Sequence, residues 1–214
     1  MILDNANLPP VIETAPWMLA DGGALDVDRC PDCWERRAHI ERYVWAAKVC
    51  RHMRVLDFGC GVGYGSEILQ LAGNLVVGVD GSAEAVKLAS ERRPTVRFRD
   101  HMIQDKYDAC VAFEVLEHLV NPQSFVMALP ARHLIASVPV RPTKETNSHH
   151  RHDFTIENFR ALIETRFAIQ SWWLQIEPYH NQPSIMVVHG QERLGVDMKT
   201  DREEVRRIGQ EVCG

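Results

Sequence analysis

The sequence predicts an α/β fold in which helices cover both faces of a parallel sheet. Two observations lead to this prediction. Short apolar runs alternate along the chain with segments whose apolar residues repeat at helical spacing. The intervals between successive runs leave room for the crossover helices that parallel strands require. The length agrees, because 214 residues suit one sizeable domain.

The individual elements follow from apolar periodicity and from helix-start residues. A first helix is expected over 35–50, where apolar residues occupy one face and charged residues the other. Ser82 and Thr155 suit N-cap positions, and the pair Asn121–Pro122 is typical of a helix start. The expected strands are 54–58, 75–79, 96–99, 109–113, 133–138, 167–174 and 185–189. The other expected helices are 65–71, 83–93, 122–129, 156–165 and 202–211.

The organisation of the chain is expected to be a lead-in over 1–34, a domain over 35–190 and a helical tail over 191–214. A net charge of −5 without a polybasic tail argues against a protein that grips long nucleic acid through its phosphates. The sequence starts without a signal-peptide pattern, and no run reaches the roughly 20 apolar residues that span a bilayer. We therefore expect a cytoplasmic protein without membrane contact, whose cysteines are thiols.

One cysteine pattern has two readings. The stretch Cys30-Pro-Asp-Cys33 has metal-ligand spacing, and Cys50 and His52 follow it, so these four side chains could form a zinc site. A lone C-x-x-C is a weak signal, however, and the alternative is a turn that carries two ordinary cysteines.

A glycine-rich stretch, VLDFGCGVGYGS at 55–66, follows the first expected strand. Glycine is used where the backbone turns tightly or where a ligand lies against it. In open α/β sheets, ligands bind at the carboxyl ends of the strands, where this turn is expected. Its spacing, Asp57-x-Gly59-x-Gly61-x-Gly63, fits neither the dinucleotide pattern G-x-G-x-x-G nor the P-loop.

Three acids at strand ends indicate the kind of ligand. Asp57, before the glycines, would repel a phosphate but favour a cationic ligand with an adenosine-like body. S-adenosylmethionine is such a ligand, since it carries an ammonium and a sulfonium. Asp80 ends the second strand, where a ribose diol is commonly bound. Asp100 follows the third strand and could accept a hydrogen bond from an adenine amino group.

These stretches, together with VVGVD at 76–80, YDACVAFEVLEHL at 107–119 and SVPV before a His-rich loop, resemble the class I S-adenosylmethionine-dependent methyltransferases. The resemblance covers roughly 35–190 and implies a doubly wound, mostly parallel, seven-stranded Rossmann-like sheet whose last strand runs antiparallel. It also implies a methyltransferase whose N-terminal helix closes over the cofactor through Arg42 or Tyr43. The cofactor-binding residues that it implies are Asp57, Gly59, Cys60, Gly61, Gly63, Asp80, Gly81, Asp100, His101 and Phe113.

Acids and histidines gather after the fourth and fifth strands. If a helical turn begins after Phe113, then Glu114, Glu117 and His118 share one face. The loop 139–152 adds three further histidines. Carboxylates and imidazoles can hold a divalent ion, and such an ion would lower the pKa of a bound substrate hydroxyl.

Two methyltransferase groups resemble this pattern. The small-RNA 3′-terminal 2′-O-methyltransferases have an E-x-x-E-H element and a later His before an aromatic residue, which bind magnesium or manganese. The ubiquinone-pathway O-methyltransferases are similar in the first element. The resemblance implies that the metal ligands are Glu114, Glu117, His118 and His152. Arg151 departs from it, because the RNA enzymes usually have an Asp there.

The alternative is a reaction without metal, in which a histidine removes the substrate proton. The candidate catalytic residues are then His118, His149 and His152. We expect O-methylation of a small hydroxylated metabolite. The alternatives are a metal-dependent RNA 2′-O-methyltransferase, which the acidic net charge disfavours, and a non-catalytic cofactor-binding domain that serves a partner protein. The acceptor atom, the oligomeric state and the use of magnesium or manganese stay open.

Overall fold

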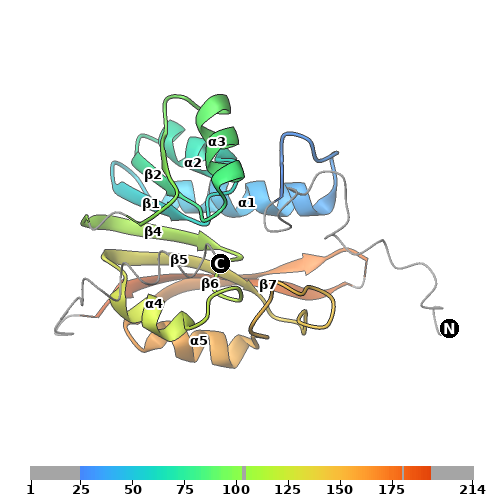
Figure 1. Ribbon diagram of the computed structural model, residues 1–214. Helices are drawn as coiled ribbons and strands as arrows, with labels where there is room; N and C mark the ends of the chain where they lie inside the picture. The colour runs from blue at the N-terminus through green and yellow to red at the C-terminus, as the bar shows by residue number, and fades with distance from the viewer. Residues whose placement is uncertain (1–24, 103–104, 180, 194–214) are drawn as a thin grey trace.

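The computed structural model describes residues 25–102, 105–179 and 181–193 (Figure 1). The strands are β1 (Arg54–Phe58), β2 (Leu75–Val79), β3 (Arg97–Arg99), β4 (Tyr107–Phe113), β5 (Ala131–Pro139), β6 (Phe167–Glu177) and β7 (Gln182–Glu192). The helices are α1 (Trp34–Val49), α2 (Tyr64–Leu71), α3 (Ala83–Arg92), α4 (Pro122–Ala128) and α5 (Ile156–Glu164). The helix expected over 202–211 lies outside the described residues.

The strands form one seven-stranded sheet in the order β3-β2-β1-β4-β5-β7-β6. The pairs β1–β2, β1–β4, β2–β3 and β4–β5 are parallel, whereas β7 runs antiparallel to both β5 and β6. The expected mostly parallel sheet with an antiparallel last strand is therefore confirmed. The strand order reverses between β1 and β4, and ligands of open α/β sheets bind at the carboxyl ends of the strands at such a point.

Two apolar layers hold helices on opposite faces of the sheet. In Figure 1, α1, α2 and α3 lie on one side, and α4 and α5 lie on the other. Alternate side chains of β1 pack into the two layers, since successive residues of a strand point to opposite faces. Leu56 packs in the cluster that contains Phe125 and Phe159, whereas Val55 packs in the cluster that contains Tyr43 and Leu69.

The expected helix starts are confirmed by their capping bonds. The Ser82 hydroxyl accepts a hydrogen bond from the Ala85 amide at 3.1 Å, and the Asn121 side chain accepts one from Ser124 at 2.9 Å. Thr155 forms a reciprocal capping box at the start of α5. Among the described residues, none of the helices is both long and apolar enough to cross a membrane.

Arg166 ties α4 and β7 to the end of α5. Its side chain is fully buried, and its guanidinium donates to three carbonyl oxygens between Val126 and Leu129 and to the Glu192 carboxylate at 2.8 Å. Replacing Arg166 by Met is expected to lower the free energy of unfolding by about 3–5 kcal/mol, because buried acceptors lose their donor. Urea denaturation measures this change.

The control for this variant is Arg160→Met, which removes an exposed i,i+4 pair with Glu164 at 3.8 Å. Exposed pairs contribute about 0–1 kcal/mol, so this second change is expected to be small. Equal losses in the two variants would contradict the structural role of Arg166.

A histidine pair joins β5 to β7. The Nδ1 atom of His133 and the Nε2 atom of His189 lie 3.1 Å apart, so one ring donates to the other. Burial, and then His133, lowers the pKa of His189 to about 4. Burial lowers the pKa of His133 as well, with Asp108 opposing the shift and Arg132 adding to it. Both rings are therefore neutral in the folded protein at neutral pH.

This pair predicts acid sensitivity of the fold. The folded-state pKa of His189 lies below the ordinary value of 6.5, so its contribution to stability is complete above pH 6.5 and is lost as the pH falls towards about 4. The variant His189→Gln is expected to show a smaller fall in Tm over that range, measured by circular dichroism. The variant His101→Gln, at an exposed position, is the control. An unchanged fall in His189→Gln would contradict the prediction.

Candidate active site

The glycine turn at 59–63 closes the carboxyl end of β1 against the end of β2. The Gly59 amide donates to the Val79 carbonyl at 2.8 Å. Gly59, Gly61 and Gly63 have φ of 75°, 52° and 84°, a backbone region that favours glycine. A Cβ on Gly59 would lie 2.3 Å from a methyl of Val115, so the turn packs directly against the segment after β4.

Asp80 lies beside this turn at the end of β2. One of its carboxylate oxygens accepts from the Gly61 amide at 2.7 Å, and the other accepts from the Ser82 amide at 2.9 Å. The side chain and the following Gly81 are partly exposed. The acid is therefore held at the edge of the glycine turn, in the position predicted for a ribose contact.

Asp57 lies below the turn and is fully buried. Its oxygens accept from the Tyr43 hydroxyl at 3.0 Å and from the Ser66 hydroxyl at 2.6 Å. Burial raises the pKa of Asp57 to about 7, although both hydrogen bonds oppose the shift. In this arrangement Asp57 joins α1, β1 and α2 and supports the turn from behind.

The other residues predicted for the cofactor divide into two groups. Cys60 and Phe113 are buried near the turn, and the Phe113 ring lies 5.0 Å from that of Tyr43. Asp100 and His101 lie past the end of β3, exposed and paired with each other at 2.6 Å. The structure thus places the second group at the outer side of the sheet.

The segment after β4 differs from the expected helical turn. Glu114 has a φ of 55°, which interrupts any helix at that residue, and the following residues form tight turns with the His118 amide donating to the Val115 carbonyl. The Ser137 hydroxyl donates to the Glu114 carboxylate at 2.7 Å. Glu114 therefore points at β5, and the expectation of one helical face for Glu114, Glu117 and His118 is wrong.

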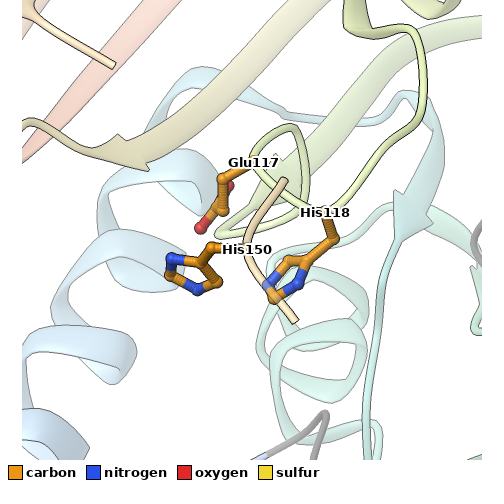
Figure 2. A group of neighbouring side chains, drawn as sticks. All are labelled: Glu117, His118 and His150. Atoms are coloured by element: carbon orange, nitrogen blue, oxygen red, sulfur yellow. The ribbon is translucent and has the colours of Figure 1, made fainter. Parts of the chain in front are cut away.

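Glu117, His118 and His150 converge at this place (Figure 2). One potential ligand atom from each lies within 4.8 Å of the others, and among the described residues this is the one group of three or more such side chains. The loop that carries His150 is held there because the Arg151 and His152 amides donate to the Glu117 carbonyl at 2.7 and 3.1 Å.

The ring orientations of the two histidines are set by neighbours. His118 Nδ1 lies 3.1 Å from the His149 carbonyl oxygen, which can only accept, so Nδ1 carries the proton and Nε2 keeps its lone pair. His150 Nδ1 pairs with the Thr143 hydroxyl at 2.6 Å. Burial lowers the pKa of His118, and burial together with His118 lowers the pKa of His150 to about 4. Both rings are neutral at neutral pH.

The side chain of Glu117 is buried. Neither of its carboxylate oxygens has a hydrogen-bond partner within the described part of the chain. Burial and then the nearby Glu114 raise its pKa well above the ordinary value. An unpaired buried carboxylate is costly, and a cation bound beside it would offset that cost.

The other two histidines of the loop lie elsewhere. His152 donates from Nε2 to the Leu119 carbonyl at 2.9 Å. His149 is exposed, and its contact with His118 is through its backbone carbonyl, while its amide donates to the Asn147 side chain at 2.9 Å. The structure therefore assembles His150 with Glu117 and His118, where the sequence interpretation had chosen His152. Their spacing along the loop carried no signal for this choice, because it depends on how the loop folds back.

Arg42 of α1 lies near Glu114 and Glu117, where its charge opposes the rise in their pKa values. It is fully buried, donates to the Gln175 side chain and lies 5.9 Å from the Phe113 ring centre. Its Nε and one terminal nitrogen have no partner among the described residues. Sequence reasoning had singled out Arg42 but missed Gln175 and Ser137, which reach the site from distant strands.

The four suggested zinc ligands do not meet. Cys33 is the N-cap of α1 and Cys50 its C-cap, so the 16-residue helix separates them by about 24 Å. Cys30 and Cys33 remain close, with their sulfur atoms 3.1 Å apart. The zinc reading is wrong for this set.

A family model described as "Methyltransferase domain" matches residues 37–154, more than half of the chain. The matched range includes the glycine turn, Asp80 and the cluster of Glu117, His118 and His150.

Curated relatives match this chain over only part of their own length. A probable S-adenosylmethionine-dependent methyltransferase of Mycolicibacterium smegmatis is 29% identical over 149 residues, which cover 62% of this chain and 58% of that protein. A mitochondrial ubiquinone biosynthesis O-methyltransferase of Arabidopsis thaliana is 30% identical over 105 residues, which cover 44% of this chain and 33% of that protein. The chain thus matches less than two thirds of either relative.

Solved structures share the fold at low identity. The N-methyltransferase NodS of Bradyrhizobium japonicum with S-adenosyl-L-homocysteine has a TM-score of 0.62 at 15% identity, covering 78% of this chain and 90% of that one. Magnesium protoporphyrin IX methyltransferase of Synechocystis with bound S-adenosylmethionine has a TM-score of 0.61 at 20% identity, covering 78% and 88%.

Proposed function

The chain belongs to the methyltransferase-domain family, and from that premise we propose that it transfers a methyl group from S-adenosylmethionine to a hydroxyl of a small metabolite. The observation that carries this proposal is the contact between the glycine turn and the segment after β4. Gly59 packs against Val115, so the cofactor edge of the site adjoins the cluster that contains Glu117 and His118. All of these residues lie within the domain that we propose over 35–190.

The cofactor side of the site is proposed at the carboxyl ends of β1 and β2. S-adenosylmethionine supplies an activated methyl group. The carboxylate of Asp80 is held by two backbone amides and is partly exposed, which suits it to accept from a ribose diol. The glycines let the backbone approach the ligand closely. Asp100 and His101 are exposed at the end of β3, and we propose that they flank the adenine.

The acceptor side requires removal of a proton from the nucleophile. His118 is neutral and its Nε2 lone pair is turned away from the His149 carbonyl, so this nitrogen can accept the substrate proton. His150 lies against it, with ring centres 4.6 Å apart. The positioning of an acceptor oxygen in line with the methyl group supplies the rest of the rate enhancement.

A divalent ion is the alternative to His118 as the means of activating the acceptor hydroxyl, because an Nε2 atom that ligates a metal has no lone pair left to take up a proton. Glu117, His118 and His150 would hold it, and their fit is supported by the buried Glu117 carboxylate without a partner. A mixed set of one carboxylate and two imidazoles suits manganese better than magnesium. When bound, such an ion lowers the pKa of a hydroxyl that coordinates it. Glu114 is bonded to Ser137 and His152 to Leu119, so we do not include them in the set.

The acceptor class is supported by the relatives and by charge. Several curated relatives carry the name ubiquinone biosynthesis O-methyltransferase, for example those of Arabidopsis thaliana and Rattus norvegicus. An RNA 2′-hydroxyl is the second candidate, because the same cluster would suit it. Arg92 and Arg93, which could form a basic patch, are instead paired with Asp26 and Asp28. This pairing favours a small substrate.

Binding of S-adenosyl-L-homocysteine by calorimetry is the first test, since failure to bind would overturn the proposal. Transfer of a labelled methyl group is then measured on catechols and other diols, on short RNA with a free terminal 2′-hydroxyl, and on amines, each with and without manganese. Transfer to diols supports the proposal. Transfer to RNA or amines alone, or cofactor binding without transfer to any of them, contradicts the proposed substrate class.

A further inference from the structure

A pair of cysteines lies at the start of α1, apart from the proposed active site. The sulfur atoms of Cys30 and Cys33 are 3.1 Å apart, and both are free thiols. We propose that Cys30 and Cys33 form a reversible disulfide by exchange with a small-molecule disulfide such as oxidised glutathione. A disulfide bond of about 2 Å requires only a small approach of the two sulfurs.

The two thiols have different surroundings, which assigns them different parts in the exchange. Cys33 is partly exposed and is the N-cap residue of α1, where the aligned peptide dipoles favour negative charge. Its side chain caps no backbone amide, so the sulfur is available. Cys30 is buried, at 3% exposure. Burial, with the hydrogen bond to Cys33, raises the pKa of Cys30 to about 12. Cys33 is therefore the attacking thiol.

The exchange proceeds in two balanced steps. The Cys33 thiolate attacks one sulfur of glutathione disulfide, and one molecule of glutathione leaves with the electron pair and takes up a proton. The Cys30 thiol then loses its proton, and its sulfur attacks the Cys33 sulfur of the mixed disulfide. The second glutathione leaves in the same way. Two protein thiols are oxidised and one small disulfide is reduced to two thiols.

The backbone before the helix keeps the buried thiol in reach. The Cys30 amide donates to the Asp26 carbonyl at 2.9 Å. The Asp26 carboxylate is bound by both terminal nitrogens of Arg92, at 2.8 and 3.1 Å. Asp28 pairs with Arg93 at 2.7 Å. These ion pairs hold the turn against α3, so the sulfur of Cys30 does not depend on a free loop for its position.

The same ion pairs lead to the glycine turn. Arg93 also donates to the Val62 carbonyl at 2.9 Å, within the 59–63 turn. A disulfide would therefore join α1, which carries Tyr43 and Arg42, to a segment that is bound through Arg93 to the cofactor side of the site. The cysteine pair is thus connected to the glycine turn through Asp28 and Arg93.

Other cysteines supply internal controls. Cys50, Cys60 and Cys110 are buried, and burial raises the pKa of each. Cys50 lies near enough to Cys110 to add to the rise in its pKa, but among the described residues no hydrogen bond joins any of the three to another cysteine sulfur. Because they are buried, the exchange is expected to spare them. Cys213 lies outside the described residues, and the variant Cys213→Ser removes it from the test.

The test equilibrates the full chain carrying Cys213→Ser with glutathione buffers of increasing oxidised fraction, then alkylates free thiols and maps the peptides by mass. We expect Cys30 and Cys33 to become protected together, with one linking disulfide, no retained glutathione and full reversal by dithiothreitol. Two free, alkylated thiols in the most oxidising buffer would overturn the proposal. So would a different pairing, or protection that a zinc chelator removes.

Two further variants test which thiol attacks first. The test for the disulfide described above does not depend on them. With Cys30→Ser, we expect Cys33 to retain glutathione, because no second thiol can displace it. With Cys33→Ser, we expect Cys30 to stay unmodified in the native protein and to react in urea. Equal glutathione adducts on Cys30 and Cys33 in the native variants would overturn the proposed exchange.

Discussion

The variant Glu117→Gln is expected to lose manganese binding and to lower methyl transfer by about a hundredfold or more. Glutamine keeps the size of the side chain but removes the charge that a cation requires. Both carboxylate oxygens of Glu117 are buried without a hydrogen-bond partner among the described residues. Removing an unpaired buried acid relieves a cost, so the Tm of the variant is expected to be unchanged or higher. Calorimetric titration with manganese, a labelled-methyl assay and thermal denaturation measure these quantities.

The combined result separates a functional from a structural role for Glu117. The control is Glu145→Gln, an exposed acid on the 139–152 loop, which should leave all three measurements unchanged. An unchanged manganese affinity in Glu117→Gln would contradict the proposed metal site. A fall in Tm with loss of activity would instead show that Glu117 stabilises the fold.

The variant Asp80→Ala is expected to weaken S-adenosyl-L-homocysteine binding by about 10–100-fold. Hydrogen bonds to charged groups contribute about 1.5–3 kcal/mol, and about 1.4 kcal/mol corresponds to a tenfold change in Kd. Asp80 also accepts from the Gly61 and Ser82 amides, so its loss releases the turn that we propose to hold the ligand. Calorimetry with the homocysteine product measures the Kd directly.

Asp100→Ala supplies the matched comparison for Asp80. Its carboxylate is exposed and paired with His101, so water competes for any ligand contact and the expected loss of affinity is smaller. Glu84→Ala, an exposed change in the first turn of α3, should have no effect. A Kd in Asp80→Ala equal to that of Glu84→Ala would contradict the proposed cofactor site.

The parts of the fold that sequence reasoning anticipated depend on local signals. The caps at Ser82, Asn121 and Thr155 bond residues three positions away, and such bonds can be read from neighbouring letters. The presence of the strands and their parallel order follow from apolar periodicity and from the length of each crossover. The exact starts do not, since β4, β5 and β7 begin two or three residues before the expected positions. Strand ends were less predictable, since β6 and β7 run on to Glu177 and Glu192 by pairing with each other.

The arrangement of the acids and histidines could not be anticipated in the same way. The left-handed backbone at Glu114 turns its carboxylate to Ser137, 23 positions later, and breaks the helical face that periodicity predicted. Which loop histidine joins Glu117 depends on two backbone bonds from 151 and 152 to the Glu117 carbonyl. Three histidines within four positions offer no sequence signal for that choice.

The amino-acid sequence by itself determined the sheet, the glycine turn and the placement of Asp80 at the end of β2. Each of these depends on residues close together in the chain or on a regular repeat. The tertiary structure alone decided that His150 joins Glu117 and His118, that Gln175 meets Arg42 across 133 positions, and that Cys50 lies far from Cys33. These outcomes depend on contacts between distant segments and on the rigid length of a helix, neither of which is written in local spacing.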